Sequence, residues 1–210
     1  MNKPPGGLFV VSAPSGGGKT SLTRASIDAL AKAGITAEIS VSHTTRAPRP
    51  GEQNGVHYHF IDRPAFEAMI ERGEFLEHAT IYSQHYGTAR ARTEQRLATG
   101  RDVILDIDWQ GARQIRQHMP GAVGIYILPP SMAKLEQRLR ARKQDSEDAI
   151  RQRLDLARRE MSHYEYYDYL IVNKDFEQAM SELVSIFVAR RLTRPTQEIR
   201  HNALIKKLIL

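Results

Sequence analysis

Short apolar runs alternate with helical patterns along most of this chain of 210 residues. Each of five runs predicts a buried strand, and they cover Leu8–Ser12, 37–42, 103–106, Val123–Leu128 and Tyr169–Val172. The clearest helical pattern covers residues 19–33 and is closed by Gly34, the usual residue after a helix C-terminus. Strands that alternate with helices are typical of βαβ units. The pattern therefore predicts an α/β fold with a five-stranded parallel sheet and helices on both faces.

Two stretches interrupt this alternation. Residues 43–90 are too long for one crossover, and they carry their own strand pattern at 56–61 and a short helix at 64–73. We interpret them as a small inserted lobe. Residues 135–156 are charged and helical with a polar break at 143–146, which predicts a helical hairpin standing off the core.

A helix and a basic tail end the chain. Residues 175–192 have an apolar face, and Asp175 and Gln178 have the spacing of a capping box. Residues 194–210 mix basic and apolar side chains. Packing on the core and a subunit interface of a homo-oligomer both remain open for this tail, and nucleic-acid binding is a weaker alternative.

The formal net charge of +6 and the absence of cysteine narrow the possible functions. Disulfides, thiolate metal sites and cysteine nucleophiles are excluded, and a reducing, cytoplasmic location is expected. The longest uncharged runs contain glycine and proline and fall short of the about 20 apolar residues of a membrane helix, so no membrane association is expected. A basic chain suits polyanionic partners, from small phosphate compounds to nucleic acid.

A glycine-rich loop between the first strand and the first helix is the strongest chemical signal. Its residues are Ala13, Pro14, Ser15, Gly16, Gly17, Gly18, Lys19 and Thr20. Such a loop turns successive backbone N–H groups toward a phosphate, and the helix N-terminus adds its positive end. Lys19 would reach the outer phosphates of ATP, and the Thr20 hydroxyl would ligate Mg²⁺. Ala13 replaces the first glycine of the strict pattern, and the alternative is a plain glycine-rich turn.

Two aspartates follow the strand predicted at 103–106. Asp106 lies where this strand ends, at the sheet edge where α/β proteins bind ligands. In P-loop proteins such a carboxylate holds the Mg²⁺ shell, directly or through water. Asp108 shares a face with Asp106 because strand side chains alternate.

Arginines gather in two further places. Arg46 and Arg49 flank a proline and have hydroxyl residues beside them, an arrangement that suits a phosphate monoester dianion. A surface loop with ordinary arginines is the alternative. Arg138 and Arg142 lie at i, i+4 on one helix face, which is mildly destabilising unless an anion lies between them. Nearby carboxylates could also neutralise this pair.

The chain resembles the guanylate kinase family over residues 7–190. The resemblance is carried by motifs in a fixed order: 13–20, 40–52, Tyr58, 75–77, 86–88, 105–111, 128–131 and 171–173. It implies a P-loop NTPase core formed by 1–42, 91–134 and 157–193, with a GMP-binding lobe at 43–90, a helical lid at 135–156 and the tail at 194–210. It also implies transfer of the ATP γ-phosphoryl group to GMP, with dGMP a further expected acceptor, giving GDP and ADP in purine nucleotide metabolism.

The resemblance assigns roles to individual residues. The GMP site would comprise Ser42, Arg46, Arg49, Tyr58, Glu77, Tyr86, Thr88 and Asp108, with Glu77 and Asp108 as carboxylate acceptors for guanine. Lys19, Arg138, Arg142 and Arg153 would stabilise charge on the transferring phosphoryl group, and Asn173 would contact ATP. Lys143 departs from the glycine that commonly follows the second lid arginine in the family.

Three other functions remain to be weighed. A phosphoprotein-binding module of this fold would have a degraded P-loop, whereas Gly18, Lys19 and Thr20 are all present. A kinase with a sugar-phosphate acceptor would not need Ser42, Glu77 and Asp108 together. A nucleic-acid binder would show strongly salt-dependent binding. The eight histidines have no metal-binding spacing.

Overall fold

A computed structural model describes residues 4–81, 83–141 and 146–209. The core is a five-stranded sheet with the order β2-β7-β1-β8-β9, and all neighbouring strands are parallel. Its strands are β1 (Leu8–Ser12), β2 (Ala37–Ile39), β7 (Asp102–Asp106), β8 (Val123–Leu128) and β9 (Tyr169–Val172). The prediction of a five-stranded parallel sheet is confirmed. The second strand is shorter than predicted, because the chain leaves the core after Ile39 to enter the lobe.

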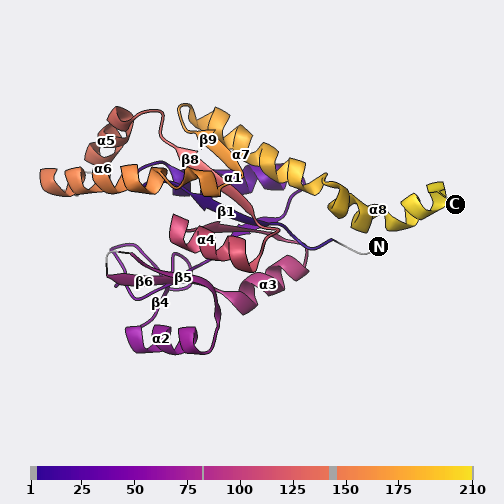
Figure 1. Ribbon diagram of the computed structural model, residues 1–210, viewed down its shortest axis with the longest axis horizontal. Helices are drawn as coiled ribbons and strands as arrows, with labels where there is room; N and C mark the ends of the chain where they lie inside the picture. Colours follow the sequence, from indigo (N-terminus) through magenta and orange to yellow (C-terminus); the bar gives the residue numbers. More distant parts are fainter. Residues whose placement is uncertain (1–3, 82, 142–145, 210) are drawn as a thin grey trace.

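Helices cover both faces of this sheet. Figure 1 shows the α1 and α7 helices (Lys19–Lys32 and Phe176–Arg191) on one face, and the α3 and α4 helices (Arg90–Ala98 and Trp109–His118) on the other. Strand residues alternate between two cores: Phe9 stacks on Phe187 of α7 with 3.6 Å between ring centroids, while Val10 joins the α3–α4 side. Burial on both faces explains why the central strands β1, β7 and β8 are mainly apolar runs.

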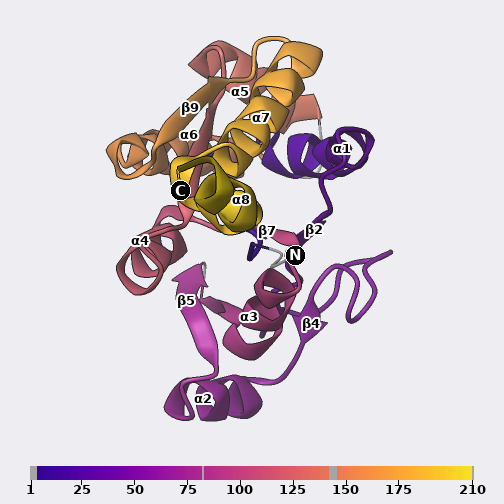
Figure 2. The ribbon, with the colours of Figure 1, turned by 90° about the vertical axis from the view of Figure 1, so that its right-hand side faces the viewer.

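The inserted lobe has its own sheet, shown below the core in Figures 1 and 2. Its strand order is β4-β3-β6-β5, formed by β3 (His43–Thr44), β4 (His59–Phe60), β5 (Phe75–Ile81) and β6 (Gln84–Ala89), with α2 (Arg63–Glu71) beside it. The strand predicted at 56–61 is wrong over its first half. Val56 lies in a turn and is 61% exposed, because Gly55 has a positive φ of 77° and Val56 N–H donates to the Gln53 carbonyl.

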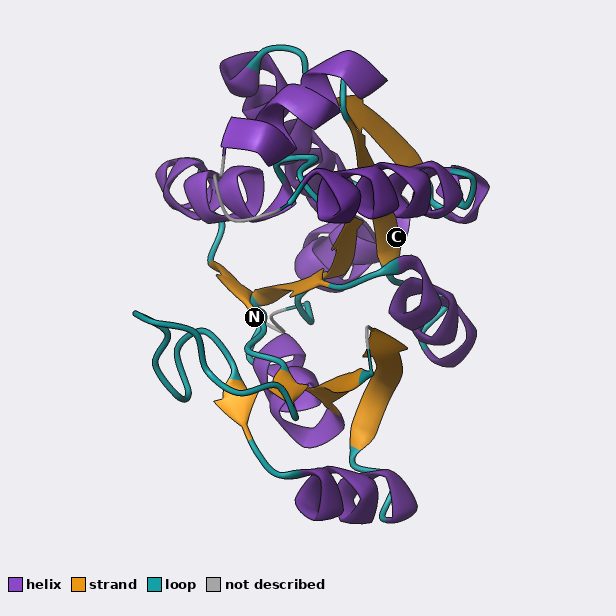
Figure 3. Ribbon diagram, turned by 90° about the vertical axis from the view of Figure 1, so that its left-hand side faces the viewer, coloured by secondary structure: helices purple, strands orange, loops and turns teal. Residues whose placement is uncertain are grey.

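The predicted helical hairpin is present. It consists of α5 (Met132–Ala141) and α6 (Glu147–Met161), and Leu135, Leu139 and Ala157 form a small apolar cluster between them. Figure 3, seen from the left-hand side of Figure 1, shows the helices of the core and the hairpin above the lobe and its separate sheet. Arg142 and Lys143, which the sequence placed in the lid, lie outside the described residues.

The tail forms a helix that the sequence pattern did not predict. After the short η1 helix (Tyr164–Tyr166), β9 and α7, the α8 helix (Arg194–Ile209) extends away from the body (Figure 1). Asp102 anchors the base of this extension: its carboxylate accepts hydrogen bonds from Gly7 N–H at 2.7 Å and from Arg191 at 3.1 Å. Leu208 and Ile209 are more than 70% exposed, so the end of the tail does not pack on the core. Among the described residues, no helix combines the length and apolar character needed to cross a membrane.

Candidate active site

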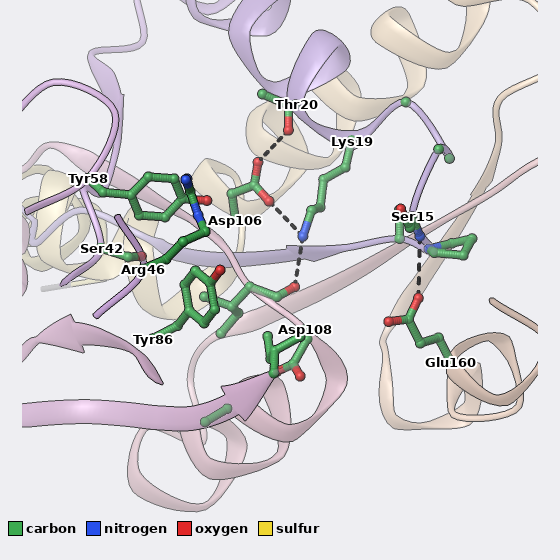
Figure 4. A pocket seen from close by; sticks show the side chains of 18 of the residues that line it. Ser15, Lys19, Thr20, Ser42, Arg46, Tyr58, Tyr86, Asp106, Asp108 and Glu160 are labelled. Atoms are coloured by element: carbon green, nitrogen blue, oxygen red, sulfur yellow. Dashed lines mark hydrogen bonds and ion pairs between the residues drawn. The ribbon is translucent and has the colours of Figure 1, made fainter. Parts of the chain in front are cut away.

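The core, the lobe and the α6 helix enclose one cleft of about 440 Å³ (Figure 4). The carboxyl ends of β1 and β7 form its floor, since Lys19 follows β1 and Asp106 ends β7. The lobe supplies the opposite wall. Its predicted site residues come from separate parts of the chain and are Ala13–Thr20, Ser42, Arg46, Arg49, Tyr58, Glu77, Tyr86, Asp106, Asp108 and Arg153.

The glycine-rich loop has the backbone of a phosphate-binding loop. Gly16 and Gly18 have positive φ values of 86° and 96°, which residues with a side chain rarely adopt. Asn173 supports the loop from behind, since its Nδ2 donates to the Gly17 carbonyl at 2.9 Å. Arg138 also lies behind it and donates to the carbonyls of Gly17 and Asn173. Arg138 and Asn173 are not among the residues that line the cleft, and the predicted roles of Arg138 in charge stabilisation and of Asn173 in ATP binding stay predictions.

Lys19 and Asp106 meet at the centre of the cleft. Lys19 Nζ lies 2.6 Å from Asp106 Oδ1 and donates to the Ile107 carbonyl at 3.1 Å. The Thr20 hydroxyl donates to Asp106 Oδ2 at 3.2 Å. A hydroxyl and a carboxylate beside a phosphate-binding loop are the oxygen ligands that Mg²⁺ prefers. The residues present therefore fit a magnesium ion bound together with a nucleotide.

Arg46 and Arg49 of the lobe lie at the cleft and share one carboxylate partner. Arg46 Nη2 donates to both oxygens of Glu52, at 2.8 and 2.9 Å, and the Arg49 N–H donates to the same carboxylate at 2.7 Å. Its hydrogen bond to Arg46 is the main reason that the pKa of Glu52 lies below its usual value. The Arg46 guanidinium lies over the ring of Tyr58, and Tyr58 packs edge-on against Tyr86. Sequence reasoning gave Glu52 no role, although it holds the guanidinium in place.

A buried carboxylate closes the lobe side of the cleft. Glu77 on β5 is paired with Thr88 on β6, and the Thr88 hydroxyl donates to Glu77 Oε1 at 2.6 Å. Burial raises the pKa of Glu77 to about 7, although the hydrogen bond from Thr88 lowers it. Thr88 itself lies behind Glu77 and does not line the cleft. Asp108 faces Glu77 from the core and caps α4, where its Oδ1 accepts the Gly111 N–H at 3.0 Å.

Glu160 at the end of α6 was not predicted as a site residue. Its carboxylate accepts the Ser15 N–H of the phosphate-binding loop at 3.3 Å (Figure 4). Burial raises its pKa above the usual value, although the Ser15 N–H and the charge of Lys19 lower it. A single glutamate in a charged helix gives no pattern, so only the folded chain reveals this contact.

Comparisons with known proteins agree on one family. A family model described as guanylate kinase matches residues 6–190. A guanylate kinase of Coxiella burnetii is 54% identical over 209 residues, covering 100% of this chain and 98% of that protein. A guanylate kinase of Escherichia coli K12 is 55% identical over 206 residues, covering 97% and 98%. The crystal structure of guanylate kinase from Anaplasma phagocytophilum superposes with a TM-score of 0.76 at 35% identity, covering 92% of this chain and 90% of that one.

Proposed function

The chain belongs to the guanylate kinase family, and from this premise we propose how its residues divide the reaction. It is a nucleoside monophosphate kinase that transfers the γ-phosphoryl group of ATP to GMP in purine nucleotide metabolism. We assign ATP to the 13–20 loop and GMP to the lobe wall of the cleft. The core would comprise 1–42, 91–134 and 157–193, with the acceptor lobe at 43–90 and the lid at 135–156.

Backbone N–H groups and Lys19 form the donor side. The loop N–H groups and the N-terminus of α1 favour negative charge, so they bind the ATP phosphates. Lys19 lies 2.6 Å from Asp106, and its ammonium moves to the outer phosphates when these add negative charge to the cleft. Arg138 and Asn173 act on ATP through the loop, because both hold the Gly17 carbonyl.

Thr20 and Asp106 would hold a magnesium ion together with ATP. When bound, Mg²⁺ neutralises charge on the phosphate oxygens. Support comes from the Thr20–Asp106 hydrogen bond, which places a hydroxyl and a carboxylate side by side. Asp106→Asn should raise the Mg²⁺ concentration needed for half-maximal activity while the melting temperature changes little.

On the acceptor side, different residues would bind the phosphate and the guanine base of GMP. Arg46 and Arg49 would bind the GMP phosphate, with Tyr58 and Tyr86 packed beside them. Glu77 and Asp108 would accept hydrogen bonds from guanine N1–H and its exocyclic amine. Thr88 orients Glu77, and Ser42 adds a hydroxyl to the same wall.

A phosphate oxygen of GMP then attacks the γ-phosphorus of ATP in line. The bond from the γ-phosphorus to the bridging oxygen breaks, ADP leaves and GDP forms, with no covalent enzyme intermediate. Catalysis consists of positioning and of charge stabilisation by Lys19 and the lid arginines Arg142 and Arg153. Closure of the lid keeps water from taking the phosphoryl group. Lys19 supplies a charge at the point where negative charge gathers in the transition state.

The observation that best supports this assignment is the opposition of Glu77 and Asp108 across the cleft. Two carboxylates suit guanine, which presents two neighbouring donors, and would leave adenine N1 unpaired. We would measure kcat/KM with ATP and Mg²⁺ for GMP, dGMP, IMP, AMP, CMP and UMP. GMP and dGMP should be the good acceptors. Equal use of GMP and AMP would contradict the assignment of the base site.

The exposed α8 helix supports a homo-oligomer, with a second copy covering the apolar side chains of Leu204, Leu208 and Ile209. Truncation after Leu192 should lower the mass measured by light scattering and spare the chemical step. A cytoplasmic location follows from the substrates, since ATP and GMP are cytoplasmic metabolites. Nucleic-acid binding is not expected, and a binding assay across salt concentrations tests this.

A further inference from the structure

Gly111 lies between the two carboxylates assigned to guanine. It is the third residue of α4, and its N–H donates to Asp108 Oδ1 at 3.0 Å. A Cβ atom built on Gly111 would lie 2.5 Å from Glu77 Oε2 and 3.1 Å from Glu77 Cδ. Real Cβ atoms essentially never lie within 3.0 Å of another atom, so the contact with Glu77 Oε2 would be a clash. The carboxylate of Glu77 therefore occupies the space that any other residue at position 111 would need.

The backbone at Gly111 does not itself require glycine. Gly111 is helical and its φ lies outside the left-handed region. Alanine is the better residue inside a helix, since glycine loses more conformational freedom on folding. Glycine at position 111 therefore makes the helix less stable than alanine would. The close approach of the Glu77 carboxylate explains why glycine is nevertheless present.

The strand that carries Glu77 is fixed to the same face of α4. Gln114, one turn after Gly111, donates to the His78 carbonyl at 2.7 Å and accepts the His78 N–H at 3.1 Å. His118, one turn further, lies 3.1 Å from the Leu76 carbonyl. Both neighbours of Glu77 are therefore held against α4. A side chain at position 111 would displace the Glu77 carboxylate before it displaced the strand.

We propose that Gly111 is a specificity-determining position, which holds Asp108 with its N–H and admits the Glu77 carboxylate through its missing side chain. The proposal rests on the assignment of Glu77 and Asp108 to guanine. Gly111 acts through these two side chains, so it is a positioning residue. It sets the distance between a carboxylate of the lobe and a carboxylate of the core.

The first test is Gly111→Ala. We expect kcat/KM for GMP to fall by about 10- to 100-fold, the cost of a mispaired buried polar group. The loss should appear in KM for GMP, with KM for ATP unchanged, and the preference for GMP over IMP and AMP should narrow. Gly121→Ala is the matched control, because no atom lies within 4 Å of a Cβ atom at Gly121. It should behave as wild type.

The second test combines Gly111→Ala with Glu77→Asp, which withdraws the carboxylate by one methylene group. If Gly111 acts through Glu77, adding Gly111→Ala to Glu77→Asp should lower kcat/KM for GMP only slightly further. Multiplicative losses in the double variant, or a wild-type KM for GMP in Gly111→Ala, would overturn the inference. Gly111→Ala alone can also lower the melting temperature. A higher melting temperature in the double variant then supports a steric conflict between a side chain at position 111 and Glu77, whereas an equally low one overturns the inference.

Glu77→Gln separates this inference from the proposed base site. If Glu77→Gln leaves the preference for GMP intact, the base site is wrong and the inference falls with it. If Glu77→Gln abolishes that preference and Gly111→Ala does not affect it, the base site stands and only the role of Gly111 is refuted.

Discussion

The Thr88 hydroxyl lies 2.6 Å from Glu77 Oε1, across the pair of strands that bounds the acceptor side of the cleft. This hydrogen bond pairs one oxygen of a carboxylate that is only 3% exposed. Burial still prevails, and the pKa of Glu77 is raised to about 7. The carboxyl that we propose as the acceptor for guanine therefore titrates near neutral pH.

The first prediction is a pH dependence of GMP use. Ionised Glu77 accepts the guanine N1–H, whereas the protonated form offers a donor in its place. We expect kcat/KM for GMP to rise with pH and level off above about 7. Glu77→Gln should abolish this rise as well as most of the activity. Thr88→Val should move the rise to higher pH, because it removes the hydrogen bond that lowers the pKa of Glu77.

The same pKa predicts an opposite trend in stability. Because the folded pKa of Glu77 exceeds its unfolded value, Glu77 stabilises the fold fully below pH 4.5 and progressively less as the pH rises through 7. Glu77→Gln should therefore gain melting temperature relative to wild type between pH 5 and pH 8. The difference corresponds to a free energy of unfolding of about 3 kcal/mol at most. A melting-temperature difference between Glu77→Gln and wild type that does not change with pH would contradict the raised pKa of Glu77.

Lys19→Ala should remove most of the turnover without unfolding the protein. Asp106 keeps the hydrogen bond from Thr20 and some contact with solvent when Lys19 is removed, so the fold should be retained. One preorganised charge or donor is worth about 10²–10³ in kcat, and we expect at least this loss. The measurements are kcat by a coupled ADP assay and the melting temperature. A near-normal kcat in a folded variant would refute the assignment of the donor site.

Arg138→Ala should lower kcat more than it raises KM for GMP. Arg138 braces the phosphate-binding loop through the carbonyls of Gly17 and Asn173. Arg140 is the matched control on the same helix, since it forms exposed ion pairs with Glu136 and Glu147. Arg140→Ala should retain full activity. Equal behaviour of the two variants would show that bracing the loop has no effect on catalysis.

Asp108→Asn separates base reading from helix capping. Asparagine caps helices as well as aspartate, so α4 should keep its stability. If Asp108 accepts the guanine amine, the variant should lose much more on GMP than on IMP, which lacks that amine. The comparison is kcat/KM for the two acceptors in wild type and variant. Equal losses on both would assign Asp108 to capping alone.

Glu160→Gln should lower KM for ATP several-fold and leave KM for GMP unchanged. The carboxylate of Glu160 lies against the Ser15 N–H, where its charge repels incoming phosphates. Glutamine keeps the hydrogen-bond acceptor but removes the charge. Titration of the free enzyme with ATP measures the change directly. A weaker affinity for ATP would mean that Glu160 shapes the loop rather than opposing the nucleotide.

The centre of the core was predictable because β1 and β7 are buried on both faces. Phe9 and Val10 point into opposite apolar cores, so the strand appears as an uninterrupted apolar run. The strands β5 and β6 gave no such signal. Glu77 and Tyr86 line the cleft from these strands, and the needs of the site override the alternation that would mark a half-buried strand.

The site was predictable where motif and chemistry coincide, as at Lys19. Support residues escaped prediction because their role depends on contacts between distant segments. Glu52 follows Arg46 by six positions in a loop that has neither a helical nor a strand pattern. Glu160 is 145 positions from Ser15 in the sequence. The tail also lacked a clear period, because α8 is kinked at His201 and its apolar residues do not share one stripe.

The lobe leaves the core after β2 and returns before α3, and it adds no strand to the five-stranded sheet. The lobe could therefore be exchanged for that of a kinase with another nucleotide acceptor. The ATP-binding core would be unchanged in such a chimera. Such a chimera would still inherit Asp108 and the first turn of α4 from its host. A successful exchange would therefore have to change the lobe and the first turn of α4 together.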